Sequence, residues 1–182
     1  MSELPYAASF CEENVWHLCA DPRVGRAGRP TPLEERRVLV ITNPQRAVAT
    51  WAQRAGDPVV WDYHVVLWAR ADEWLAWDLD TTLGLPLPAQ DWLDGSFRSG
   101  VPETFAPRFR LLAAAEYRAV FSSDRAHMLD QRGRPRAPFP SWPPILRPGG
   151  PTLGRLLDLT RREPGLVLDL PGLLALLRAD RL

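Results

Sequence analysis

A cysteine, a histidine and an aspartate lie in segments that could bring them together as a nucleophilic triad. Cys11 begins the stretch CEENVWHLCA, His64 lies within PVVWDYHVVLWAR, and Asp78 lies within EWLAWDLD. A thiol attacks a carbonyl carbon as its thiolate, an imidazole moves the protons, and a carboxylate holds the imidazole in the required tautomer. These residue types therefore indicate acyl-group chemistry, provided that the fold brings them into contact.

The segment that carries Cys11 has the pattern of a helix. Apolar residues recur at helical spacing at Val15, Leu18 and Cys19. Acidic residues suited to a first turn follow Cys11 directly, at Glu12 and Glu13. We therefore expect Cys11 at a helix N-terminus, where the helix dipole and a nearby imidazolium lower the pKa of a thiol. Two cysteines on one helix at this spacing are too far apart for a disulfide, so both thiols are expected to be free.

The segments that carry His64 and Asp78 read as an antiparallel hairpin, because both are rich in β-branched and aromatic residues. They cover residues 58–70 and 73–80. A symmetric turn centred on Ala71 would place His64 directly opposite Asp78, with Asp80 as a diagonal neighbour on the same face. The spacing thus predicts that Asp78 orients His64.

Other segments position these three. Strands are expected at Val38–Thr42 and Phe109–Leu112, and helices at Ala47–Ala55, Ala113–Phe121, Leu153–Leu159 and Leu173–Leu177. Loops are expected at Asp21–Pro32 and over SSDRAHM (122–128). A proline-rich surface segment at about 132–151 has too many prolines and glycines for a helix or a central strand. Such a segment is either packed by Phe139, Trp142 and Ile145 or partly mobile, and we expect it to be packed.

Length and composition exclude several classes of protein. A chain of 182 residues with 46% hydrophobic and 24% charged residues fits one globular domain, 1–182. Basic and acidic residues balance at 22 each, so neither nucleic acid nor an anionic membrane is an expected partner. The sequence contains no lysine, which excludes Schiff-base chemistry and a Walker-type phosphate loop. Without an apolar membrane span or a secretory signal, we expect a cytoplasmic location. We also expect the protein to be a monomer.

Four motifs, CEENVW, PVVWDYHVVL, WDLDT and SSDRAHM, occur in this order and resemble the protein N-terminal glutamine amidohydrolase family. The resemblance extends from about Tyr6 to Met128. It implies an α/β fold, an α-β-α sandwich around a mainly antiparallel sheet, related to papain-like and transglutaminase-like proteins. It also implies a triad of Cys11, His64 and Asp78, with no metal and no cofactor. The implied reaction deamidates the N-terminal glutamine of a protein or peptide to glutamate, with release of ammonia.

Recognition of a chain terminus requires groups that bind its free ammonium. Acidic candidates are Glu12, Glu13, Asp62 and Asp124, each of which also has a structural interpretation as a helix-dipole or loop residue. Aromatic candidates for the pocket wall are Trp16, Trp61 and Trp77, although most tryptophans pack in cores.

The loop SSDRAHM is expected to lie beside the active site, with Asp124 and Arg125 as a local ion pair. His127 in this loop could indicate a second site or a zinc ligand, but the absence of CxxC or HxxxH spacing argues against a metal site.

Two other classes of function remain open. A thiol protease or acyltransferase could use the same triad, and a non-catalytic module that binds peptide termini could keep the pocket without needing Cys11.

Overall fold

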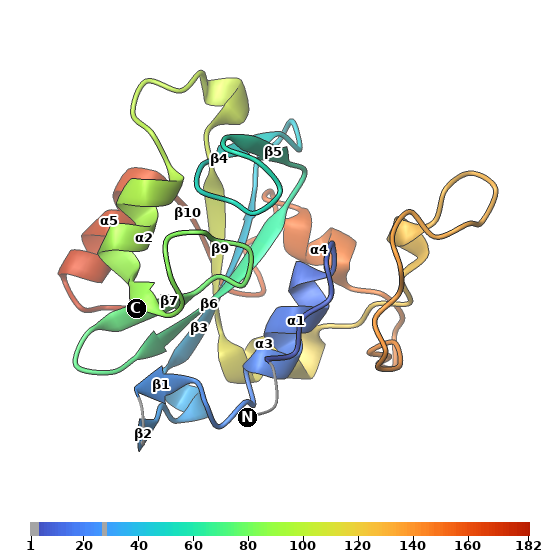
Figure 1. Ribbon diagram of the computed structural model, residues 1–182, viewed down its shortest axis with the longest axis horizontal. Helices are drawn as coiled ribbons and strands as arrows, with labels where there is room; N and C mark the ends of the chain where they lie inside the picture. Colours follow the sequence, from blue (N-terminus) through green and yellow to red (C-terminus); the bar gives the residue numbers. More distant parts are fainter. Residues whose placement is uncertain (1–3, 27–28) are drawn as a thin grey trace.

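The computed structural model describes residues 4–26 and 29–182, and its centre is a six-stranded sheet (Figure 1). In spatial order the strands are β10 (Leu166–Asp169), β9 (Arg108–Ala113), β3 (Arg36–Thr42), β6 (His64–Arg70), β7 (Trp74–Trp77) and β8 (Leu87–Pro88). Each neighbouring pair is antiparallel. The prediction of a mixed α/β fold with a mainly antiparallel sheet is therefore confirmed.

Helices cover both faces of this sheet (Figure 1). One layer holds α1 (Cys11–Leu18), α3 (Ala114–Val120) and α4 (Leu153–Leu157). The other holds α2 (Ala89–Ser96) and α5 (Leu170–Arg178). The sheet thus lies between two hydrophobic cores, and the helix that begins at Cys11 packs on one of them.

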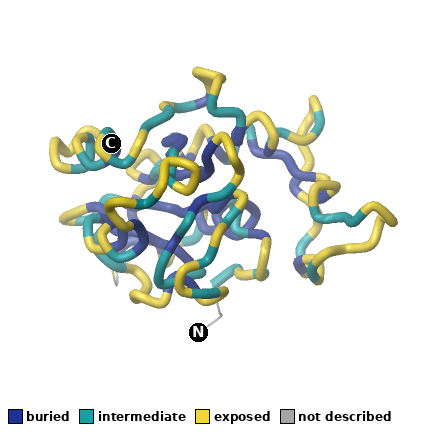
Figure 2. The backbone as a smooth tube through the Cα atoms, turned by 90° about the horizontal axis from the view of Figure 1, so that it is seen from above, coloured by how far each residue is buried: buried dark blue, intermediate teal, exposed yellow. Residues whose placement is uncertain are grey.

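The central strands are buried on both faces because their successive side chains enter different cores. In β3, Val38 and Val40 belong to the core under α1, whereas Leu39 and Ile41 belong to the core under α2. A strand in such a position reads as a continuous hydrophobic run, which is why VLVIT was recognisable as a strand. Figure 2 shows these strands as the buried centre of the chain.

Two small sheets and three short 3-10 helices complete the described residues. The small sheets pair β1 (Gly25–Arg26) with β2 (Arg29–Pro30), and β4 (Val48–Thr50) with β5 (Val59–Trp61). The 3-10 helices are η1 (Leu33–Glu35), η2 (Glu103–Phe105) and η3 (Ala126–Met128). Short pairing therefore occurs within the predicted loop at Asp21–Pro32, of which residues 27 and 28 lie outside the described residues.

The predicted helix at Ala47–Ala55 is wrong. Strand β4 occupies its first half, and the chain then turns at Ala52, whose φ of 53° lies in the left-handed region. A helix cannot continue through that backbone conformation. The pairing of β4 with β5 took precedence over a weak local helix preference.

The proline-rich segment at 132–151 contains no helix and no strand in the structure. It extends from the body of the protein at the right of Figure 1, and much of it is exposed in Figure 2. Ile145 is buried, Trp142 is half-buried, and the exposed Phe139 packs edge-on against Phe10 at 5.9 Å between ring centroids. The predicted packing residues do hold the segment to the body.

The C-terminal region contains both predicted leucine-rich helices, as α4 and α5. Sequence reasoning missed β10, which lies at the edge of the sheet just before α5. Within the part of the chain that the structure describes, none of the helices combines the length and the apolar character needed to cross a membrane.

Candidate active site

Cys11 is the first residue of α1, as predicted. The chain before it is fixed by Asn14, whose side chain accepts a hydrogen bond from the Ala7 N–H at 2.8 Å and donates one to the Ala7 carbonyl at 2.9 Å. Cys11 is half-buried and lines a cavity, whereas Cys19 is buried in the core, and both thiols are free. The start of the helix therefore presents one accessible sulfur.

The electrostatic surroundings of this sulfur differ from the expectation of an activated thiolate. Burial, followed by the carboxylates of Glu12 and Asp80, raises the pKa of Cys11 well above its usual range, and the backbone N–H of Val65 opposes this shift only in part. In the free protein Cys11 is therefore a protonated thiol, and a base has to remove its proton.

His64 and Asp78 form a buried hydrogen-bonded pair. The distance from His64 Nε2 to Asp78 Oδ1 is 2.8 Å, and both side chains are almost inaccessible to solvent. Burial acts against the charged imidazolium, but the charge and hydrogen bond of Asp78 outweigh it and raise the pKa of His64. Burial would likewise raise the pKa of Asp78, but His64 and two further donors lower it.

The Asp78 carboxylate is held by four donors in all. Oδ1 also accepts the backbone N–H of Asp80 at 3.0 Å, while Oδ2 accepts Gln53 Nε2 at 3.1 Å and Trp92 Nε1 at 3.0 Å. Sequence reasoning missed Gln53 and Trp92, since nothing in their local sequence relates them to Asp78. This network fixes the carboxylate and, through it, the ring of His64.

The hairpin register differs from the predicted one by two residues. Leu67 pairs with Trp77 and Arg70 with Trp74, so the turn is centred on Asp72 and not on Ala71. If this register were extended, Asp80 would lie opposite His64. However, β7 ends at Trp77, and the chain beyond it turns Asp78 toward His64.

Asp78, His64 and Asp80 also form a group whose polar atoms lie within 4.8 Å of one another, the geometry in which a metal ion can bind. Both oxygens of Asp78 already accept hydrogen bonds from protein donors, and His64 Nε2 points at one of them. These contacts fit a hydrogen-bonded triad better than a set of metal ligands.

A cavity of about 500 Å³ opens beside Cys11 and His64. Of the predicted binding residues, Trp61, Asp62 and Asp124 line it. Trp61 stacks on His64, with ring centroids 5.6 Å apart and an angle of 15° between the planes. The cavity therefore has an aromatic wall over the imidazole and carboxylates at its edge.

Trp16 and Trp77 do not line this cavity. The Trp16 indole donates to the Arg118 carbonyl at 3.2 Å and stacks under the Arg118 guanidinium, while Trp77 is buried in the core under α1. For these two residues the packing interpretation is the one that the structure supports.

Glu12 is fully buried behind the thiol and does not line the cavity. Its Oε2 accepts the Tyr63 hydroxyl at 3.1 Å and lies 3.7 Å from Cys11 Sγ, and its Oε1 lies 3.3 Å from His127 Nε2. His127 itself lines the cavity. The histidine that sequence reasoning set aside thus belongs to the same site, although nothing in its spacing marked it.

Glu13 belongs to a buried cluster that we call the anchor cluster, formed by Glu13, Arg125 and Trp142. Arg125 Nε and Nη2 donate to the two Glu13 oxygens at 2.8 and 2.6 Å, and Trp142 Nε1 donates to Oε2 at 2.7 Å. The predicted Asp124–Arg125 ion pair is therefore wrong. Asp124 instead accepts the backbone N–H of Ala126 at 2.9 Å, because Arg125 turns inward to the buried carboxylate.

Comparison with known proteins points to one family, both by a family profile and by individual relatives. A profile of the N-terminal glutamine amidase family matches residues 6–173. A protein N-terminal glutamine amidohydrolase from Bos taurus is 36% identical, over 91% of this chain and 83% of its own length. The human protein of that name is 37% identical, over 77% of this chain and 70% of its own length. The Drosophila melanogaster protein of that name is 39% identical, over 80% of this chain and 74% of its own length.

Proposed function

Because the chain belongs to the N-terminal glutamine amidase family, we propose that it deamidates the side chain of an N-terminal glutamine to glutamate and releases ammonia. The substrates are proteins or peptides with a free N-terminus. Apart from the family relationship, the main support for the proposal is the buried His64–Asp78 pair, which lies at the cavity that Cys11 lines.

In the first step the Cys11 thiol is the nucleophile. Since Asp78 occupies His64 Nε2, the other ring nitrogen, Nδ1, accepts the thiol proton. The sulfur attacks the δ-carboxamide carbon. Backbone N–H groups in the first turn of α1, which lack partners within the helix, stabilise the negative charge that develops on the oxygen.

In the second step the carbon–nitrogen bond breaks. The His64 imidazolium gives its proton to the departing nitrogen, which leaves as ammonia, and a thioester to Cys11 remains. A water molecule then gives a proton to His64 and attacks the thioester carbon. The carbon–sulfur bond breaks, the thiol regains a proton, and the product is an N-terminal glutamate.

The predicted binding residues divide into two groups under this proposal. Trp61, Asp62 and Asp124 line the cavity and act in substrate binding. Glu12 and Glu13 act from behind the site, because the Glu12 side chain contacts Cys11 and Glu13 holds Arg125. We further propose a papain-like and transglutaminase-like Cys-His-Asp core in a single domain, acting as a cytoplasmic monomer without a cofactor or metal.

The decisive experiment measures both ammonia and product mass for a peptide that begins with glutamine. Conversion of the amide to the acid, with an intact peptide chain, is expected. An N-acetylated peptide should be a poor substrate because it lacks the ammonium. An N-terminal asparagine should react about 100-fold more slowly, because its shorter side chain misplaces the carboxamide. Cleavage of internal peptide bonds, or equal rates on free and acetylated peptides, would contradict the proposal.

A further inference from the structure

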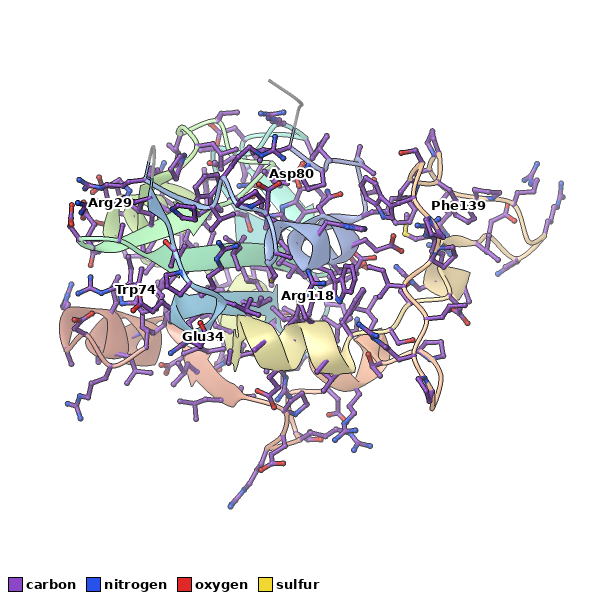
Figure 3. All side chains as sticks on the ribbon, turned by 90° about the horizontal axis from the view of Figure 1, so that it is seen from below. Arg29, Glu34, Trp74, Asp80, Arg118 and Phe139 are labelled. Carbon is purple, nitrogen blue, oxygen red and sulfur yellow. The ribbon has the colours of Figure 1, made fainter. Side chains whose placement is uncertain are left out.

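Asp80 is an acidic residue at the catalytic cavity whose role the triad does not explain. Its backbone N–H donates to Asp78 Oδ1 at 3.0 Å, and its carbonyl accepts the Arg54 N–H at 2.7 Å. Its side-chain Oδ1 accepts the Tyr6 hydroxyl at 2.7 Å. Figure 3 shows Asp80 beside the N-terminal segment that leads into α1. Asp80 is therefore held both through its main chain and through one oxygen of its carboxylate.

The donor to Asp80 is a phenol that keeps its proton. Burial, followed by the hydrogen bond to Asp80, raises the pKa of Tyr6 to about 12. Tyr6 therefore donates at any pH at which the protein is expected to work, and it leaves Oδ2 of Asp80 available to a second donor.

Asp80 differs from the other carboxylates that line the cavity. Asp62 and Asp124 are exposed, and each uses one oxygen to accept a backbone N–H of its own loop, at 2.9 Å in both cases. Asp80 is half-buried, and one of its oxygens lies within 4.8 Å of a ring nitrogen of His64. A charge near the low-dielectric interior binds a cation more strongly than a charge at the surface. Of the three, Asp80 is the best placed to bind an ammonium beside the reacting carbon.

The proposed reaction needs such a group because its intermediate can react in two ways. The thioester carbon and the terminal amine belong to the same glutaminyl residue, and their union closes a five-membered lactam ring. A free amine could attack the thioester, break the carbon–sulfur bond and give its proton to Cys11, with no water consumed. The product would be a pyroglutamyl terminus. A protonated amine has no lone pair and cannot attack.

We propose that Asp80, held by Tyr6, binds the terminal ammonium of the substrate and thereby commits the thioester to hydrolysis and not to cyclisation. The inference rests on the proposed deamidation. An ammonium paired with Asp80 stays protonated, and its nitrogen points away from the thioester. The same ammonium offsets a negative charge that disfavours the Cys11 thiolate in the free protein.

The test compares Asp80→Asn with the wild-type protein on a glutamine-initiated peptide. Mass spectrometry separates the two products, since the acid contains one water more than the lactam. We expect KM to rise about 10- to 100-fold in Asp80→Asn, as a charge-assisted hydrogen bond is lost, and a lactam product to appear. Asp94→Asn, which removes an exposed carboxylate of α2 outside this cavity, is the matched control, and its product should remain glutamate. Cys11→Ser measures spontaneous cyclisation, which is subtracted.

A second variant covers the case in which Asp80→Asn does not fold. Tyr6→Phe keeps the Asp80 carboxylate but frees it to move. Some lactam product is therefore expected in this variant, in a smaller fraction than in Asp80→Asn. An unchanged KM with only glutamate as product, in a folded Asp80→Asn or, where that variant does not fold, in Tyr6→Phe, would overturn the role of Asp80. Failure of the wild-type protein to release ammonia would instead refute the proposed deamidation itself.

Discussion

Replacement of Asp78 by asparagine tests how much the triad depends on the carboxylate network. The aspartate offers two oxygens to four donors, whereas asparagine has one oxygen and an NH2 group that must face two of these donors. With the NH2 group at the Oδ1 position, His64 can shift its proton to the other ring nitrogen and accept. The backbone N–H of Asp80 is then left without a partner.

The opposite orientation of the new amide also leaves one donor without a partner. With the NH2 group at the Oδ2 position, Gln53 can turn its amide and offer its Oε1, which has no partner in the native structure. The Trp92 indole N–H is then left unpaired. One unsatisfied buried donor costs about 1–3 kcal/mol. We therefore expect Asp78→Asn to fold, with an unfolding free energy lower by this amount in urea titrations.

The effect on turnover should be far larger than the effect on stability. Without the negative charge, the pKa of His64 falls and the imidazolium is no longer stabilised. The corresponding change in a serine triad lowers turnover by about 10⁴-fold, and ammonia release should fall by a similar factor. Gln53→Ala is the control, because it removes one donor and keeps the charge. A folded Asp78→Asn within tenfold of wild type, or a greater loss of kcat in Asp80→Asn, would refute the reasoning.

Four further results are expected. Cys11→Ser should abolish ammonia release and change the unfolding free energy by only about 1 kcal/mol; normal turnover in this variant would exclude Cys11 as the nucleophile. Protonated His64 cannot accept the thiol proton, and the pKa of His64 is raised above its usual value of about 6.5. The acid-side decline of kcat/KM should therefore have its midpoint above this pH, and a pH–rate profile with a lower midpoint would contradict the assignment. Arg125→Met leaves Glu13 buried without its counter-charge and should lower the unfolding free energy, measured in urea, by about 3–5 kcal/mol. Adding Glu13→Gln in a double variant should restore part of this loss, and additive effects of the two changes would disprove the coupling. Burial raises the pKa of Cys19 from 9.0 to about 12, so as the pH rises the unfolded chain loses the thiol proton at a lower pH than the folded protein does. The unfolding free energy should therefore decline between pH 9 and 12, and it should decline more in the wild-type protein than in Cys19→Ala.

The sequence was most informative about which residues share a face of the sheet. Side chains alternate along a strand with a period of two, so a register error of two residues moves a partner along the strand but keeps it on the same face. His64 and Asp78 therefore remained on one face although the turn is centred on Asp72. The prediction named the correct partner for an incomplete reason, because the contact forms where β7 has already ended.

The long-range polar partners could not have been predicted in this way. Trp92 reaches Asp78 from α2, and Arg125 reaches Glu13 across more than 100 residues of chain. Such contacts depend on how layers pack, and local periodicity carries no information about them. Arg125 adopts a left-handed backbone conformation, with φ of 62°, that turns its side chain inward, and its residue type gave no signal of this.

The anchor cluster has a consequence for how this protein can change over evolution. Trp142 fixes one part of the proline-rich segment against Glu13, and Ser123 fixes another through a backbone hydrogen bond of 2.8 Å to Ile145. Phe139, labelled in Figure 3, packs where the segment meets the body. Residues 130–136 project beyond these attachments and include Arg136 at the cavity. Changes in their length or charge would alter the cavity wall at Arg136 and leave the contacts that hold the start of α1 unchanged.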